Sequence, residues 1–352
     1  MLDFSKIRKK NCWSKEKALK WQKEHPYTIG VNYIPQTAIN STEMWEEESF
    51  DIKTIDKELH WAHNYGYNGI RVFLPYIVYE REGENFLKTI EKFLQICDIH
   101  KIKVTFVLFD DCAFSNLLPY YGKQREPIKL VHNSGWTASP GEIMVNDRNC
   151  YDKLKEYLQT VMGRFKDDER VLMWDLYNEC GNNKSGKKSE HLLKSAFLWA
   201  REVNPSQPIT ACVWAVVNGD AVEGCYDLDT ICFEQSDVIT YHYYGNIDLM
   251  KSFVKNINAS GYPLFCTEWL ARVFFDCRVD TILPYFSENN ISSYHWGFVN
   301  GKTQTNIPWN WDSAKGEPDV WFHDVVHRDG TPYNEEEMRI IKAISQKNCA
   351  KK

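Results

Sequence analysis

The sequence has no run of 18 apolar residues, and its N-terminal segment MLDFSKIRKKNCWSKEK is charged without an apolar stretch. Neither a membrane-spanning helix nor a signal peptide is therefore expected, which predicts a cytoplasmic protein. C-x-x-C pairs are also missing, and the 11 cysteines are an odd number, so reduced thiols are favoured over a disulfide framework. A net charge of -6 and a pI near 6.0 give no basic surface for nucleic acid.

What the sequence does contain is apolar and aromatic side chains, at 43% and 14% of 352 residues, enough for a large core. Eight short segments rich in β-branched and aromatic residues predict strands. Most are apolar almost throughout, as strands of a parallel sheet covered on both faces must be. The predicted strands span 27–35, 67–75, 103–110, 171–179, 208–215, 237–245, 262–271 and 292–300.

Amphipathic helical patterns alternate with these strands. One pattern spans 52–62 and stops at Gly66, and another spans 86–97 after a predicted cap at Asn85. Similar patterns occupy roughly 150–165, 189–203, 247–259, 279–289 and 334–346. Eightfold strand-helix alternation predicts a (β/α)8 barrel, with one catalytic domain over 1–352 and a barrel core at about 27–346.

Two segments are too long to be simple connections. They follow predicted strands 3 and 8, at 111–147 and 301–333, and their aromatic content argues against disorder. Because strands 3 and 8 are separated in a closed ring only by strands 1 and 2, the two loops are expected to meet over the barrel mouth.

Active sites of such barrels lie at the carboxyl ends of the strands. The side chains at those ends are Arg71, Asp110, Asp111, Asn178, Glu179, His242, Tyr244, Glu268 and Trp296. A single strand-end Glu is usually only solvated, but Glu179 and Glu268 both end apolar segments, WDLYNE and LFCTEW. Two carboxylates in one barrel mouth suit glycoside hydrolysis, in which one protonates the leaving oxygen and the other attacks the sugar.

The surroundings of the two carboxylates predict different roles. Arg71 and Tyr244 would favour the ionised form of Glu268, which suits the nucleophile. Glu179 has no obvious cation near it in sequence, so burial should raise its pKa and suit it to be the acid. A retaining mechanism further predicts that the two carboxyl groups lie about 5–5.5 Å apart.

The residues at these strand ends resemble glycoside hydrolase clan A, and most closely its family 5 of cellulases, mannanases and xylanases. The resemblance covers the whole barrel and rests on Arg71, Asn178-Glu179, His242-x-Tyr244, Glu268 and Trp296. It implies that Asn178 binds the sugar 2-hydroxyl, that Tyr244 steadies the nucleophile and that Trp296 forms a floor under the sugar. Two departures stand out: Asp110-Asp111 where that family commonly has a His, and Cys180 where it commonly has Pro.

Aromatic residues in the two long loops are candidates for stacking on sugar rings. Trp136, Trp309, Trp311 and Trp321 lie there, while His132 and Asn133 could add polar contacts. Packing within the loops is the alternative for all six. Trp61, Trp174 and Trp199 fall inside predicted helices or strands and are expected in the core.

Other functions fit the sequence less well. No H-x-H follows strand 1, and the one close histidine pair, His60 and His63, falls on a predicted helix, so no metal site is expected. A phosphate barrel would need a Gly-rich loop after strand 7 or 8, and TEWLARVFF has none. A silent glycan-binding barrel is expected to have lost one carboxylate.

The sequence therefore predicts a retaining β-glycoside hydrolase that needs no cofactor, with Glu179 as acid/base and Glu268 as nucleophile. Its expected partner is a β-linked plant-type glycan or oligosaccharide of the gluco, manno or xylo series, not nucleic acid or a membrane. The long loops are expected to close one side of the pocket, which favours action on chain ends or short oligosaccharides. Endo action is the alternative.

Overall fold

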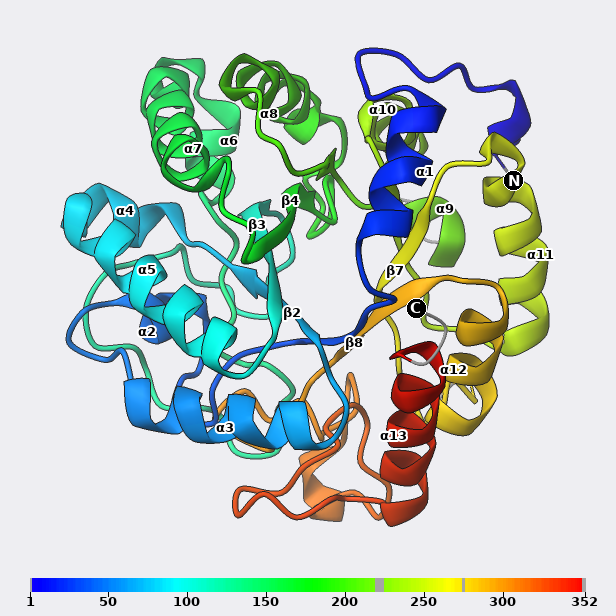
Figure 1. The fold of residues 1–352 in the computed structure, drawn as a ribbon. Coiled ribbons are helices and arrows are strands. Elements are labelled where there is room, and N and C mark those ends of the chain that lie inside the picture. The colour runs from blue at the N-terminus through cyan, green and yellow to red at the C-terminus, as the bar shows by residue number, and fades with distance from the viewer. Residues whose placement is uncertain (1, 219–224, 274–275, 350–352) are drawn as a thin grey trace.

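The computed structural model describes residues 2–218, 225–273 and 276–349, which form a ring of parallel strands surrounded by helices (Figure 1). Hydrogen-bonded neighbours follow the order β5-β4-β3-β2-β1-β8-β7-β6. A parallel bridge between Val213 and Tyr241 joins the two outer strands and closes the ring. The strands are β1 (Ile29–Asn32), β2 (Gly69–Phe73), β3 (Lys103–Asp110), β4 (Val171–Asn178), β5 (Ile209–Thr210), β6 (Ile239–His242), β7 (Leu264–Glu268) and β8 (Ser292–Trp296). The predicted (β/α)8 barrel is confirmed.

Each predicted helix has a counterpart in the structure. The α-helices are α1 (Lys15–Glu24), α2 (Ser41–Trp45), α3 (Ile52–Asn64), α4 (Tyr76–Glu82), α5 (Glu84–Ile99), α6 (Glu142–Asn146), α7 (Tyr151–Phe165), α8 (Glu190–Val203), α9 (Ala215–Asn218), α10 (Cys225–Gln235), α11 (Ile247–Ile257), α12 (Val279–Glu288) and α13 (Glu335–Cys349). Short 3-10 helices are η1 (Phe4–Lys6), η2 (Arg148–Cys150), η3 (Gly186–Ser189), η4 (Asn258–Ser260) and η5 (Ser313–Lys315).

Local signals explain where several helices start. Asp51 caps α3 by accepting a hydrogen bond from the Thr54 amide at 3.0 Å, and Asn246 caps α11 through the Leu249 amide at 3.0 Å. The predicted cap of α5 at Asn85 is wrong, because the helix begins at Glu84, directly after Gly83, whose φ of 52° suits glycine. Asn85 lies in the first turn of that helix.

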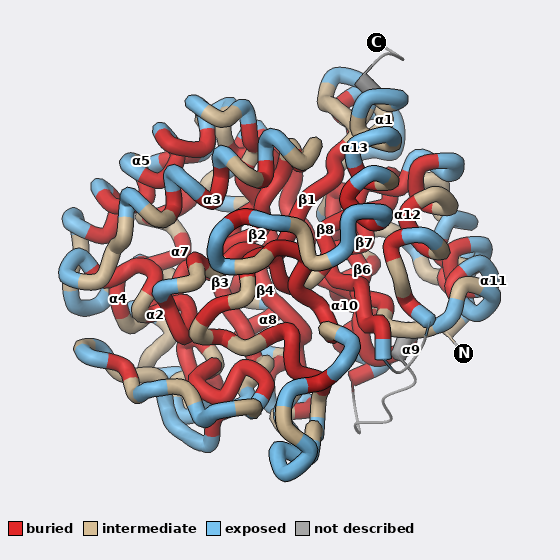
Figure 2. The backbone as a smooth tube through the Cα atoms, turned by 90° about the horizontal axis from the view of Figure 1, so that it is seen from below, coloured by how far each residue is buried: buried red, intermediate tan, exposed pale blue. Residues whose placement is uncertain are grey.

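Buried residues run along the strands and the inward faces of the helices, which Figure 2 shows as red strands inside a partly blue shell of helices. At the amino-terminal end of the barrel, the Tyr294 ring lies over Gly30 and Gly69, where a Cβ atom would come within 2.3 and 3.2 Å of it. Trp174 and Trp199 are buried in the core as expected, and Trp61 is partly buried. His60 and His63 are exposed on α3.

Two further expectations concern cysteines and membranes. Ten cysteines in the described parts of the chain carry free thiols: Cys12, Cys97, Cys112, Cys150, Cys180, Cys212, Cys225, Cys232, Cys266 and Cys277. Among the helices that the structure describes, none combines the length and the apolar character needed to cross a bilayer.

Candidate active site

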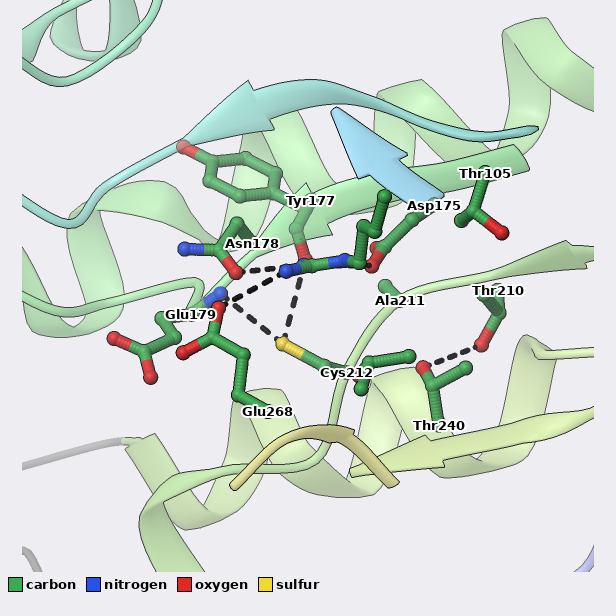
Figure 3. Close-up of polar contacts among 12 residues, drawn as sticks. Thr105, Asp175, Tyr177, Asn178, Glu179, Thr210, Ala211, Cys212, Thr240 and Glu268 are labelled. Carbon is green, nitrogen blue, oxygen red and sulfur yellow. Dashed lines mark hydrogen bonds and ion pairs between the residues drawn. The ribbon is translucent and has the colours of Figure 1, made fainter. Parts of the chain in front are cut away.

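Two glutamates, at the ends of β4 and β7, lie close together in the barrel mouth (Figure 3). Glu179 is the first residue after β4 and takes a left-handed φ of 44°, so the chain turns sharply away from the strand there. Its amide N–H donates to the Cys212 sulfur at 3.2 Å, which fixes this turn against the chain after β5. One oxygen of Glu179, one of Glu268 and a ring nitrogen of His242 all lie within 4.8 Å of one another.

Glu268 is held by a cation and a phenol. Arg71 Nη1 donates to Glu268 Oε1 at 2.9 Å, and the Tyr244 hydroxyl donates to Oε2 at 2.9 Å. Both partners are those expected from the sequence. Burial raises the pKa of Glu268, while Arg71 and Tyr244 oppose that rise by favouring the carboxylate.

Arg71 is the centre of the polar network beneath the site and is completely buried. Besides Glu268, it donates to Asp175 Oδ2 from Nε and Nη2 at 3.0 and 2.8 Å, to Asn32 at 2.8 Å and to Asn178 at 2.7 Å. Asp175 is the acidic residue in the middle of the apolar segment WDLYNE. Its buried carboxylate therefore balances the Arg71 charge inside the barrel.

Glu179 has different partners from Glu268. Its Oε1 lies 2.8 Å from His242 Nδ1, and its Oε2 accepts a hydrogen bond from Asn182 Nδ2 at 2.5 Å. Burial raises the pKa of Glu179, and burial also lowers the pKa of His242 to about 4, so the imidazole is neutral at pH 7. No cation contacts Glu179 directly within the described residues, which makes it the carboxyl more ready to hold a proton.

Glu179, His242 and Glu268 also have the spacing of metal ligands, the one such group found in the described residues. Arg71 already supplies a buried positive charge 2.9 Å from Glu268. A metal cation at this position would meet that charge in a poorly screened environment. The arrangement is therefore better suited to proton transfer and nucleophilic attack than to metal binding.

Above the carboxylates lies a pocket of about 560 Å³. Its lining includes nine predicted site residues: His132, Asn133, Trp136, Asn178, Glu179, Tyr244, Glu268, Trp296 and Trp309. Trp296 and Trp136 meet edge to face with ring centroids 5.7 Å apart, and form one aromatic side of it. Arg71 and His242 lie beneath the lining and touch the carboxylates from below.

The structure does not place four loop and strand-end candidates in this pocket. Asp110 accepts hydrogen bonds from Trp136 Nε1 and Asn178 Nδ2, both at 2.8 Å, and so supports the lining from behind. Asp111 is directed into the protein, against Tyr177 and Gly181. Trp311 donates to the Gly316 carbonyl within its own loop, and Trp321 stacks on Tyr333 at 4.7 Å, so both pack within the loop after β8.

The two long loops meet over the pocket as expected. The Asn133 amide donates to the Thr303 carbonyl at 2.7 Å, and the Leu130 amide donates to the Gln304 side chain at 2.8 Å. His132 Nδ1 lies 2.7 Å from the Ile307 carbonyl and must donate to it. These contacts join loops about 170 residues apart in sequence into one wall.

Several lining residues were not predicted: Cys112, Phe114, Asn182, Trp214, Tyr243, Asn246, Leu249 and His323. Leu249 comes from α11, His323 from the long loop after β8, and the others from segments that follow strands rather than from the strands. A weak signal existed for Asn182, which stands three residues after Glu179 in a Gly/Asn-rich turn. Nothing in the sequence distinguishes His323 from a histidine that only packs.

The parallel barrel with carboxylates at the ends of β4 and β7, within 4.8 Å of each other, defines the class as a retaining glycoside hydrolase. An inverting site would need about 6.5–9.5 Å for an intervening water. More particularly, the chain belongs to glycosyl hydrolase family 5, because the cellulase model of that family matches residues 34–302. The resemblance found in the sequence is confirmed.

Solved structures share this fold at low identity. An exo-β-1,4-mannosidase from Opitutaceae bacterium strain TAV5 is 17% identical, with a TM-score of 0.63 over 92% of this chain and 60% of that chain. The chain thus spans 60% of that mannosidase's length. An endo-1,4-β-mannanase from Rhizomucor miehei is 12% identical, with a TM-score of 0.58 over 93% and 96%. A β-mannanase from Mytilus edulis is 13% identical, with a TM-score of 0.56 over 92% of both chains. No curated protein matches the sequence.

Proposed function

We propose that the protein hydrolyses β-linked oligosaccharides of the manno, gluco or xylo series with retention, acting on chain ends or short chains. Glu268 is the nucleophile and Glu179 the acid/base. The observation that carries this assignment is the asymmetry of their contacts: Arg71 and Tyr244 both donate to Glu268, whereas Glu179 faces neutral groups. Two buried carboxyls this close ionise unequally, and the one beside the cation ionises first.

These contacts support a two-step reaction. Glu268 attacks the anomeric carbon while Glu179 gives its proton to the leaving oxygen, which forms a glycosyl ester on Glu268. Glu179, now ionised, takes a proton from water, and the water oxygen attacks the same carbon and releases Glu268. Arg71 keeps Glu268 charged for the attack, and Asn178 is held by Arg71 and Asp110 with its amide beside the site.

The wall formed by the two long loops supports action on chain ends. His132 and Asn133 from one loop and Trp309 and His323 from the other line the same pocket. Their loops are joined by hydrogen bonds rather than separated by a groove. An endo-acting enzyme needs a cleft open at both ends, so this wall favours a site that accepts one end of a chain.

The wall also favours neutral sugars. His132 donates from Nδ1 to a carbonyl, and burial lowers its pKa to about 4, so its Nε2 is an uncharged acceptor. Burial likewise holds the pKa of His323 well below its usual value. With both imidazoles uncharged, this wall offers no cation to a uronic acid carboxylate, which favours neutral sugars.

The test is hydrolysis of a panel of aryl β-glycosides and soluble polysaccharides, starting with β-mannosides because several similar folds are named mannosidase or mannanase. Proton NMR of the first product should show the β-anomer. Product sizes should be short from the start, with viscosity falling slowly. An early, steep fall in viscosity would establish endo action, and the absence of turnover on every substrate would favour a glycan-binding barrel.

A further inference from the structure

Asp111 is a buried carboxylate for which the proposed reaction has no use. It is 3% exposed, directly follows β3 and lies outside the pocket lining. Its Oδ1 accepts from the Tyr177 hydroxyl at 2.8 Å, and its Oδ2 accepts from the Gly181 amide at 2.7 Å and from the Ser189 hydroxyl. Such a group is costly to bury unless its hydrogen bonds are satisfied, and here all three donors come from one stretch of chain.

That stretch is the one that carries Glu179. Tyr177 precedes Glu179 on β4, Gly181 follows it by two residues, and Ser189 stands where α8 begins. Asp111 therefore ties together the strand before the acid/base residue, the turn after it and the helix to which the turn leads. The Asp111 amide completes this link by donating to the Asn178 carbonyl at 3.2 Å.

The turn needs such an anchor because its backbone is strained. Glu179 has a φ of 44° and Gly181 a φ of 89°, both in the left-handed region. A residue with a side chain adopts the left-handed conformation only at a cost in free energy, so surrounding contacts must hold it there. A Cβ at Gly181 would come within 2.7 Å of Leu228, so only glycine lets this amide reach Asp111.

Asn182 is positioned by the same turn. Its amide donates to the Glu179 carbonyl at 2.9 Å, and its side chain donates to Glu179 Oε2 at 2.5 Å. Displacement of Gly181 would move the adjacent Asn182 and alter the contact with the Glu179 oxygen that it faces. Asp111 would therefore influence the proton on Glu179 indirectly, through Gly181 and Asn182, without contacting the sugar.

We propose that Asp111 is a positioning residue that holds the turn carrying Glu179 and Asn182 so that the acid proton meets the leaving oxygen. This rests on the proposed role of Glu179 as general acid. The expected signature is selective: substrates with poor leaving groups need the proton and suffer from a misplaced acid, whereas substrates with good leaving groups need it little.

The test compares Asp111→Asn with Glu58→Gln as a matched control. Glu58 is another fully buried carboxylate, on α3, and accepts hydrogen bonds from Tyr33 and Gln36 at 2.8 Å each. Each enzyme is assayed with the 2,4-dinitrophenyl and the methyl β-glycoside of the sugar that the wild type prefers. Asp111→Asn should lose about 10- to 100-fold in kcat on the methyl glycoside and less than about threefold on the dinitrophenyl one. Glu58→Gln should change both equally.

A second measurement does not depend on activity. Hydrogen exchange of the peptide spanning 179–189 should speed up in Asp111→Asn and stay unchanged in Glu58→Gln. If Asp111→Asn does not fold, Ser189→Ala removes one of the three donors and should give the same two effects at smaller size. Equal loss on both substrates, or unchanged exchange in 179–189, would overturn the role of Asp111. Failure of the wild type on every glycoside would instead refute the proposed function, and the exchange result would still decide the anchoring.

Discussion

Replacing Arg71 by methionine should be the most damaging single change in the barrel interior. The substitution keeps an unbranched side chain but leaves Asp175 and Glu268 as buried carboxylates without a cation, and these are 0% and 5% exposed. Removing one partner of a buried ion pair costs about 3–5 kcal/mol. An unfolding entropy of about 2.1 cal/mol/K per residue over 352 residues gives about 0.7 kcal/mol/K. The Tm should therefore fall by about 4–7 °C.

Arg170 provides the control, because it also pairs with two carboxylates, those of Glu91 and Asp168, but at the surface. Arg170→Met should cost about 1 kcal/mol or less, which is a Tm change of about 1 °C. Calorimetry at pH 8 and pH 5 makes the comparison. Loss of Arg71 raises the folded pKa of Asp175 and Glu268 further above their unfolded values, so the penalty should be full at pH 8 and shrink at pH 5 as both protonate. Equal Tm shifts for the two variants would refute the assigned role of Arg71.

Three further outcomes follow from the site. Glu179→Ala should lose about 10²- to 10⁴-fold in kcat on alkyl or sugar leaving groups and far less on dinitrophenyl glycosides, because only the former need the proton; equal losses, measured by initial rates, would mean that the roles are misassigned. Glu268→Gly should be inactive until azide is added, since Arg71 and Tyr244 are left as donors for an anion, and the azide product seen by NMR should have the inverted configuration; recovery with retained configuration contradicts the assignment. Trp309→Ala should raise KM on oligosaccharides more than it lowers kcat, because the ring lines the pocket and packs edge to face on Tyr244; a loss confined to kcat would count against a binding role.

The strands could be predicted because their apolar runs are nearly continuous. Strands β3 and β4 match their predicted ranges within one residue, since burial on both faces leaves a clear signal. The strand predicted at 208–215 is too long, because only Ile209 and Thr210 form β5. Beyond Thr210 the chain is buried but irregular. An apolar run alone cannot distinguish a buried strand from a buried irregular segment. Helix α10 was missed, since its buried face includes Asp229 and therefore lacks a clean apolar pattern.

Side-chain direction explains which of the predicted residues lie at the pocket. Glu179, Glu268 and Arg71 could be placed because residues at the ends of parallel strands share one edge of the barrel. Asp110 and Asp111 are adjacent in sequence, yet neighbouring residues of an extended chain point to opposite sides. Asp110 thus supports Asn178 and Trp136, while Asp111 turns toward Gly181. A position at a strand end predicts at which edge of the barrel a residue lies, but not which residues its side chain contacts.

The choice of substrate is expected to depend on the loops, whereas the chemistry depends on residues at the strand ends. The reacting groups stand on strands, so their spacing follows from barrel geometry and from the Arg71 network that locks them. The wall opposite is made by His132 and His323, whose rings lie 5.3 Å apart and whose Nδ1 atoms each donate to a carbonyl of a segment distant in sequence. Those carbonyls fix which imidazole nitrogen remains an acceptor. We therefore expect that a change in either long loop would alter the sugar that is accepted while the carboxylates keep their separation.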